Sequence, residues 1–128
     1  MNKYKIAQLV ILLIILIEMP AKAQVNEAKT YTVDICIYGG TAAGVIAAYT
    51  AIKCGKSVIL IEPGKMLGGM TTGGLGATDI GNKQAITGLA RQFYRSVGQK
   101  YGVEEQWTFE PHIAQEVIQS YIDRGKIK

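Results

Sequence analysis

The stretch that decides the fold runs from Val33 to Gly44 and reads Val-Asp-Ile-Cys-Ile-Tyr-Gly-Gly-Thr-Ala-Ala-Gly. Its first half, Val33–Tyr38, is apolar and β-branched, which predicts a buried strand. A glycine-rich turn follows at once, and the Ala-rich segment from Ala42 to about Lys53 predicts a helix. A strand, a tight turn and a helix in immediate succession are typical of the beginning of an α/β unit.

A second predicted strand completes this unit. Gly55 lies where a helix C-terminal cap residue is expected, and Ser57–Ile61 is again apolar. Strand, helix and strand fit within about 30 residues, the length of a βαβ unit. We therefore expect two parallel, neighbouring strands joined by a right-handed crossover.

The rest of the sequence predicts a long loop followed by two amphipathic helices. Residues 63–83 are too rich in Gly and Thr for a regular element. The last helix begins near Pro111, a residue suited to the first helical position, and Gly125 lies just past its end. The apolar faces are Ile86, Leu89, Phe93, Val97 and Tyr101 for the first helix, and Ile113, Val117, Ile118 and Tyr121 for the second.

The N-terminus predicts a signal peptide over residues 1–23. A basic segment, Met1–Lys5, precedes the unbroken apolar run Leu9–Ile17, and Ala21-Lys22-Ala23 offers a small-x-small cleavage site. A membrane anchor is the alternative, but this run is much shorter than the ~20 residues that span a bilayer. We expect an exported protein, periplasmic or secreted, with no stable membrane anchor after cleavage. A flexible arm, 24–31, would then lead into a domain over 32–128.

The charge does not indicate a nucleic-acid partner. The formal net charge is +4, of which the predicted signal peptide carries +2, so about +2 remains on the rest of the chain. No basic stripe is visible in the sequence. Arg91, Arg95 and Lys100 are expected to form the solvated face of their helix.

The turn Gly39-Gly40-Thr41-Ala42-Ala43-Gly44 has the form of a dinucleotide-binding turn. Gly39 allows the tight bend after the strand, and Gly44 allows the helix to pack closely on that strand. A pyrophosphate would then lie on the free N–H groups at the helix N-terminus. Thr41 replaces the usual middle glycine, and its hydroxyl is a candidate donor to phosphate. The alternative is a tight turn without a ligand.

Glu62 supports the dinucleotide interpretation. It ends the second predicted strand, 18 residues after Gly44, close to the ~20-residue spacing of the acid that binds a ribose diol. An acidic residue at this position disfavours a 2′-phosphate and hence NADP. A solvated charge at a strand end is the alternative for Glu62.

Three segments carry a resemblance to a known family. Residues 34–48, which contain the first glycine-rich turn, resemble the start of the FAD-dependent oxidoreductases with a glutathione-reductase-type Rossmann domain. Glu62-Pro63 and the second glycine-rich stretch, 67–76, are similar to one bacterial branch in which this stretch runs over the FAD from the adenosine toward the isoalloxazine. Trp107–His112, opening a helix, also resembles that branch. The resemblance covers about residues 32–128.

The resemblance implies FAD as the cofactor and a partial Rossmann-like FAD-binding domain, in which a parallel βαβ unit is followed by helices. By position, the first turn would cradle the pyrophosphate, Glu62 would bind the adenosine ribose, and the second stretch would line the path toward the flavin. A plain surface loop is the alternative for the second stretch. The implied binding residues are Gly39, Gly40, Thr41, Ala43, Gly44, Glu62, Gly68, Gly69 and Met70, with Thr71 and Thr72 as candidates for polar contacts.

The implied function is the FAD-binding portion of an exported flavin-dependent oxidoreductase that acts on a small organic or sugar-derived substrate. Related enzymes take their substrate site and much of their flavin pocket from later sequence. We therefore expect a chain too short to be active alone, with a missing C-terminal portion of the same enzyme as its partner. The alternatives are a non-catalytic remnant or binding module of Rossmann fold, and an NAD-binding domain.

The other chemically notable residues have plainer interpretations. One histidine and two separated cysteines offer no spacing for a metal site. Cys36 and Cys54 are expected to be small buried side chains rather than a disulfide. His112 is expected at the surface or in a helix cap, and Trp107 and Phe109 are expected to pack. No catalytic acid or base is identified.

Overall fold

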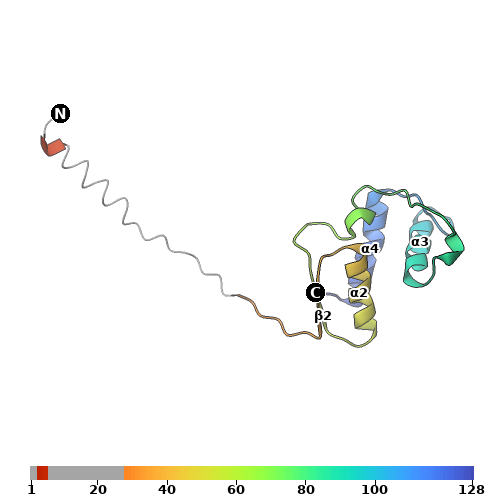
Figure 1. Ribbon diagram of the computed structural model, residues 1–128, viewed down its shortest axis with the longest axis horizontal. Coiled ribbons are helices and arrows are strands. Elements are labelled where there is room, and N and C mark those ends of the chain that lie inside the picture. Colours follow the sequence, from red (N-terminus) through yellow and green to blue (C-terminus); the bar gives the residue numbers. More distant parts are fainter. Residues whose placement is uncertain (1–2, 6–27) are drawn as a thin grey trace. The chain divides into compact units, whose positions relative to one another are not determined.

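The computed structural model describes residues 3–5 and 28–128, and residues 32–128 form a unit of their own (Figure 1). The apolar run and the cleavage site of the predicted signal peptide lie outside the described residues, as does half of the predicted arm. Within the described parts of the chain, no helix is both long and apolar enough to cross a bilayer.

The predicted βαβ unit is present. Strand β1 (Ile35–Tyr38) leads into helix α2 (Ala42–Lys53), and strand β2 (Val58–Ile61) pairs with β1 in parallel. Both strands begin later than expected. At their N-terminal ends the Asp34 carboxylate accepts hydrogen bonds from the Ser57 N–H at 2.8 Å and from the Ser57 hydroxyl at 2.7 Å. The Asp34 and Ser57 side chains thus join the two chain segments just before the backbone hydrogen bonds between β1 and β2 begin.

The predicted C-terminal end of α2 is confirmed. Cys54 is the cap residue, and Gly55 follows with a φ of +76°. A residue in this left-handed region ends a helix, and glycine adopts it without strain.

The stretch 63–83 contains more local structure than the sequence predicts. It includes the short 3₁₀-helix η1 (Gly69–Thr71), and a second one, η2 (Lys83–Ala85), follows it. Isolated bridges join Gly68 to Thr41 and Ala77 to Thr108. The predicted long loop is confirmed, since residues 63–83 contain no α-helix or strand, and contacts with distant segments give the loop its local order.

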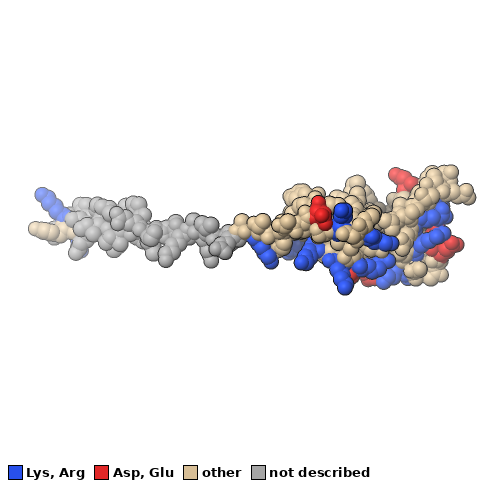
Figure 2. All heavy atoms as spheres, turned by 90° about the horizontal axis from the view of Figure 1, so that it is seen from below, with Lys and Arg blue, Asp and Glu red and all other residues tan. Residues whose placement is uncertain are grey.

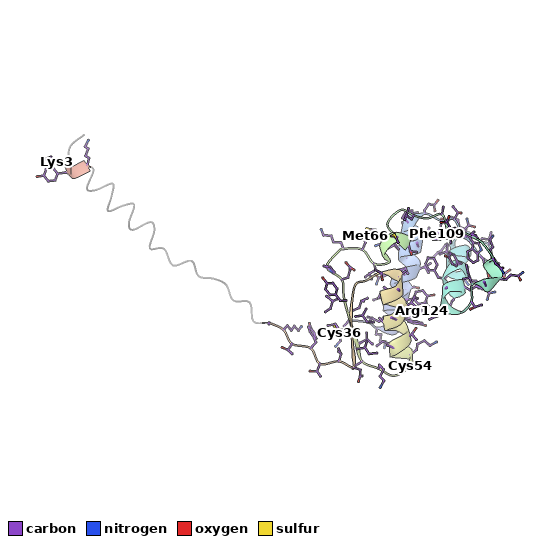
Figure 3. The ribbon with its side chains drawn as sticks, viewed as in Figure 1. Lys3, Cys36, Cys54, Met66, Phe109 and Arg124 are labelled. Carbon is purple, nitrogen blue, oxygen red and sulfur yellow. The ribbon has the colours of Figure 1, made fainter. Side chains whose placement is uncertain are left out.

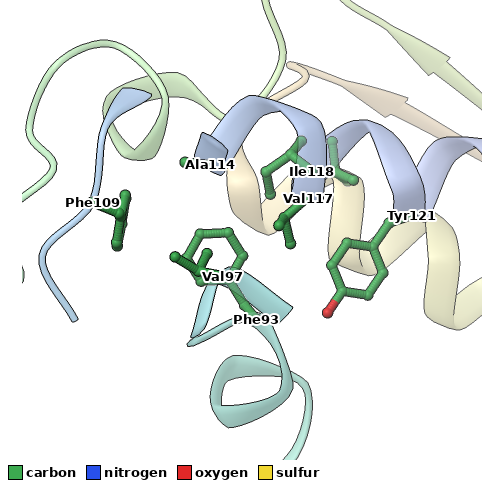
Figure 4. Packing of buried hydrophobic residues seen from close by; sticks show 8 residues of the cluster. Phe93, Val97, Phe109, Ala114, Val117, Ile118 and Tyr121 are labelled. Carbon is green, nitrogen blue, oxygen red and sulfur yellow. The ribbon is translucent and has the colours of Figure 1, made fainter. Parts of the chain in front are cut away.

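Helices α3 (Gly88–Lys100) and α4 (Pro111–Gly125) supply most of the hydrophobic core. Helix α4 packs on α2, and α3 packs on α4 (Figure 1). The packing of Phe109 is confirmed, and so are the predicted apolar faces at Leu89, Phe93 and Val97 of α3 and at the four predicted residues of α4. Ile86 was predicted on the face of the first helix, but it precedes α3, and Tyr101 is exposed. The buried cluster, drawn in Figure 4, consists of Val45, Phe93, Val97, Phe109, Ala114, Val117, Ile118 and Tyr121.

The end of α4 differs slightly from the prediction. Gly125 is the last helical residue, and the following Lys126 has a φ of +50°. A Cβ on Gly125 would lie 3.5 Å from Cδ2 of Tyr49 and 3.0 Å from Cδ1 of Ile127. The tight contact is with the Ile127 side chain, which folds back over the end of α4, whereas the distance to Tyr49 of α2 is an ordinary van der Waals contact.

The prediction that both cysteines are buried was wrong. Cys36 and Cys54 are free and exposed (Figure 3). Side chains alternate along a strand, and Ile37 faces Gly44 of α2, so Cys36 points to the opposite face of the sheet. Tyr38 lies on that same face and is 76% exposed. The described helices cover the other face, and burial on both faces could not be inferred from apolar character alone.

Candidate functional site

The first glycine-rich turn joins the ends of both strands. Gly39 has a φ of +108°, and its N–H donates to the Ile61 carbonyl oxygen at 2.8 Å. A Cβ on Gly44 would overlap the carbonyl oxygen of Gly39. The turn therefore requires glycine at both positions, as the motif predicts: one for its backbone angle and one for close approach.

The N-terminus of α2 presents free hydrogen-bond donors. Thr41 is the N-cap residue, and its Oγ1 accepts from the Gly44 N–H at 3.1 Å. The Val45 N–H donates to the Thr41 carbonyl oxygen at 2.9 Å. Among the described residues, none accepts a hydrogen bond from the N–H of Ala42 or Ala43. These two donors point out of the positive end of the helix dipole and suit an anion.

Thr41 thus has a role that the sequence analysis missed. Its residue type directly before a helix is a known capping signal, so this role was available from the sequence. The hydroxyl accepts one hydrogen bond as the cap, and its own proton is still free to be donated. A contact between this proton and a phosphate stays a prediction.

Glu62 lies directly beside the turn. Its Oε2 accepts from the Gly40 N–H at 2.6 Å, and its Oε1 accepts from the Gly64 N–H at 2.6 Å. The side chain is half-buried, so it is not simply a solvated charge at a strand end. An ionised carboxylate has about four acceptor sites, so each oxygen can accept a further hydrogen bond. The arrangement is compatible with the predicted ribose contact, which stays a prediction.

The second glycine-rich stretch lies against the first. The Gly68 N–H donates to the Gly40 carbonyl oxygen at 2.7 Å, and Gly68 also forms the bridge to Thr41. A Cβ on Gly69 would lie 3.6 Å from the Thr41 Cα. Two segments that are separate in the sequence thus form one continuous backbone surface at the start of α2.

The three residues after Gly69 differ in exposure. Met70 is 76% exposed, and Thr71 is half-buried at the edge of a pocket between α2 and α3. Thr72 is 1% exposed, and its hydroxyl donates to the Leu67 carbonyl oxygen at 2.5 Å. The Thr72 hydroxyl is therefore used to hold the loop in shape.

Basic and acidic side chains both appear on the face of the domain that Figure 2 shows. Within residues 3–5 and 28–128, no three or more His, Cys, Asp or Glu side chains gather as a metal site would require.

Of the predicted site, Gly39–Gly44, Glu62 and Gly68–Thr71 converge at the N-terminus of α2. This arrangement can bind a diphosphate at the helix and a diol at the carboxylate.

One comparison with known proteins agrees with this geometry. The model of a family described as FAD dependent oxidoreductase matches residues 34–128. The matched range contains both glycine-rich stretches, Glu62 and helices α2, α3 and α4. No solved structure matches the chain.

Proposed function

This chain belongs to the FAD dependent oxidoreductase family, whose cofactor is FAD, and from this membership we propose that residues 32–128 are the FAD-binding portion of an exported flavin-dependent oxidoreductase. In this proposal the βαβ unit is part of a Rossmann sheet of the glutathione-reductase type. The substrate is a small organic or sugar-derived molecule, which analogy with related flavoproteins alone supports.

The observation that carries the proposal is the placement of Glu62 beside a helix N-terminus with two free donors. The N–H groups of Ala42 and Ala43 would bind the pyrophosphate, with the Thr41 hydroxyl as a further donor. The Glu62 carboxylate, held by Gly40, would accept hydrogen bonds from the adenosine ribose. The backbone of Gly68 and Gly69 would guide the flavin half of the molecule past the turn.

Bound FAD supplies hydride or electron transfer, and the protein supplies binding and orientation. The absence of a Cβ on Gly40 lets Leu67 approach the turn, because a Cβ there would overlap Cδ2 of Leu67. The two glycine-rich stretches therefore hold each other in place before any ligand binds. Such preorganisation reduces the ordering cost of binding.

A flavin titration of the full chain tests the proposal. We expect saturable binding of FAD at micromolar or lower concentration, followed by flavin fluorescence and absorbance. A folded chain that binds NAD but not FAD, or neither, would contradict the proposal and favour the alternatives of an NAD-binding domain or a non-catalytic remnant. Circular dichroism on the same sample establishes that the chain is folded.

The role of Glu62 has its own test. Glu62→Ala should weaken FAD binding by about 1–3 kcal/mol, as expected for loss of hydrogen bonds to a charged group. FMN, which lacks the adenosine ribose, is the matched ligand, and its affinity should change less. An equal loss for FAD and FMN would show that Glu62 acts only by holding the turn through Gly40 and Gly64.

Export is supported by the basic Met1–Lys5 segment, the apolar Leu9–Ile17 run and the site at Ala23. Mass spectrometry of the exported protein should find Gln24 as the new N-terminus. Recovery of the protein in the membrane fraction with Met1 intact would instead favour the membrane anchor.

A further inference from the structure

The Thr72 side chain is buried in the second glycine-rich stretch, directly after η1. Thr72 is 1% exposed, and apart from Tyr121 it is the only buried residue among those described whose side chain carries a hydroxyl, an amide or a charge. A buried hydroxyl is unfavourable unless it is hydrogen-bonded. Thr72 Oγ1 donates to the Leu67 carbonyl oxygen at 2.5 Å, and the Gly69 carbonyl oxygen lies 3.3 Å away. The hydroxyl therefore acts on the loop rather than on a ligand.

The peptide group between Leu67 and Gly68 is held at both of its polar ends. Its carbonyl oxygen accepts the hydrogen bond from Thr72, and its N–H donates to the Gly40 carbonyl oxygen at 2.7 Å. In a planar trans peptide the C=O and the N–H point in opposite directions. A half-turn of this peptide would separate both partners and bring the carbonyl oxygens of Leu67 and Gly40 together. The two hydrogen bonds thus fix one orientation of the peptide.

The shape of Thr72 also fits the stretch that it holds. Gly68 has a φ of +99°, and a Cβ on it would overlap Cγ2 of Thr72. The methyl group of Thr72 therefore fills the space beside a glycine that has no side chain. Serine would keep the hydroxyl and lose this methyl group, whereas valine would keep the shape and lose the donor. The two substitutions separate the hydrogen bond from the packing.

The oriented peptide leads directly to the proposed FAD site. Gly40 accepts from the Gly68 N–H, and its own N–H donates to Glu62 Oε2 at 2.6 Å. Gly68 also forms the isolated bridge to Thr41, the N-cap residue of α2. Hydrogen bonds in series therefore connect the Thr72 hydroxyl with the turn and with the carboxylate beside it.

The two glycine-rich stretches differ in how far they depend on Thr72. The first turn has supports of its own, because the Gly39 N–H donates to the Ile61 carbonyl oxygen at 2.8 Å and Glu62 holds Gly40. In the second stretch, Thr72 is the only described residue that donates a hydrogen bond to the Leu67 carbonyl oxygen. Loss of the hydroxyl should therefore disturb the second stretch and leave the first turn in place.

We propose that Thr72 is a positioning residue for FAD binding. Its hydroxyl holds the Leu67–Gly68 peptide, and through it the backbone of the second stretch, in the orientation that meets the flavin half of FAD. Thr72 itself makes no contact with FAD, although its place in the sequence pattern suggests a polar contact. The inference rests on the proposed function, in which the second stretch guides that half of the ligand.

The test compares FAD with ADP, which shares the adenosine and the two phosphates but lacks the flavin half. Thr72→Val should lower the FAD affinity of the full chain about tenfold, which corresponds to about 1.4 kcal/mol. The affinity for ADP should stay unchanged, because ADP needs only the first turn and Glu62. Thr72→Ser should restore most of the FAD affinity, since it restores the donor.

Thr50→Val is the matched control. The Thr50 hydroxyl also donates to a backbone carbonyl oxygen, that of Ile46 at 2.8 Å, but within α2 and at an exposed position. Its loss should change neither affinity. Amide hydrogen exchange measures the peptide directly: Thr72→Val should speed exchange at the Gly68 N–H more than at the N–H of Val97 in the core. A merely destabilised fold would speed exchange at both alike.

Thr72→Ala, which also lacks the hydroxyl, takes the place of Thr72→Val should that variant fail to fold. Full FAD affinity in the folded variant, an equal loss for FAD and ADP, or no recovery with Thr72→Ser would overturn the inference. Each of these results leaves the proposed function intact as long as the unmodified chain binds FAD. An unmodified, folded chain that binds neither FAD nor ADP would overturn both.

Discussion

At the scale of single residues, Gly44 shows how one missing atom shapes the site. Alanine is favoured over glycine within a helix by roughly 1 kcal/mol. At Gly44 this preference is opposed by overlap between the added Cβ and the Gly39 carbonyl oxygen, a backbone atom of the turn itself. Relief would require α2 to move away from β1, so packing decides against the intrinsic preference.

We therefore expect Gly44→Ala to destabilise the chain by about 1–3 kcal/mol, the range for overpacked positions. Urea unfolding measures this change. Gly81→Ala is the matched control, because an added Cβ there would meet no atom within 4 Å, and it should shift the stability by no more than about 0.5 kcal/mol. If both variants unfold at the same urea concentration, the turn geometry is not as described.

At the scale of elements, α3 is tied to the segment that follows it by Glu105. The Arg91 guanidinium contacts both Glu105 oxygens, at 2.6 and 3.2 Å, and Arg95 Nε lies 3.1 Å from Oε1. A Cβ on Gly98 would lie 2.8 Å from the Glu105 nitrogen, so the segment passes directly over the helix. Two arginines predicted as part of a solvated face thus hold a connection that leads to α4.

This contact predicts a pH dependence. The hydrogen bond from Arg91 holds the pKa of the Glu105 carboxyl below its usual value, with Arg95 acting in the same direction. A lowered pKa in the folded state means that the contribution is present above the unfolded pKa, near pH 4.3, and is lost as the pH falls further. Glu105→Gln should therefore be less stable than the unmodified chain at pH 7, and the difference should shrink below about pH 4.

Thermal unfolding between pH 2 and pH 7 measures the difference. Glu104→Gln is the control, because Glu104 makes one long contact with Arg95 at 3.7 Å and its side chain is 85% exposed. A stability difference for Glu105→Gln that does not change with pH would contradict the role of its charge.

At the scale of the whole molecule, the proposed FAD site joins segments that are separate in the sequence, between Gly39 and Thr72. The first turn, Glu62 and the second glycine-rich stretch would all contact one ligand. A ligand that binds only the folded state stabilises it by mass action, by about 2.7 kcal/mol at a hundredfold excess over Kd. For a domain of this size that corresponds to a rise in unfolding temperature of roughly 10–20 °C.

A thermal melt with and without FAD measures this effect in the full chain. The Glu62→Ala variant, at the same FAD concentration, should show a smaller rise because its Kd is larger. An equal rise in unfolding temperature for both proteins would contradict the contact between Glu62 and FAD. If FAD does not raise the unfolding temperature of the folded, unmodified chain, the proposed function is contradicted.

Local patterns in the sequence determined the elements and the chemistry of the turn. Apolar, β-branched runs predicted β1 and β2, three- and four-residue spacing predicted the faces of α3 and α4, and glycine spacing with Glu62 predicted a dinucleotide site. These features depend on neighbours within a turn or a strand, so the sequence contains them directly. The family match then agreed with the cofactor that the resemblance implied.

Only the tertiary structure decided which faces meet. The exposure of Cys36, the contact between Glu62 and Gly40 and the pocket beside α2 all depend on segments that are distant in the sequence. An apolar pattern indicates that a face can be buried, but the partner that covers it is set by the packing of whole helices. For that reason the sequence determined the turn and its acid, and the packing of α3 on α4 and of α4 on α2 determined which apolar faces form the core.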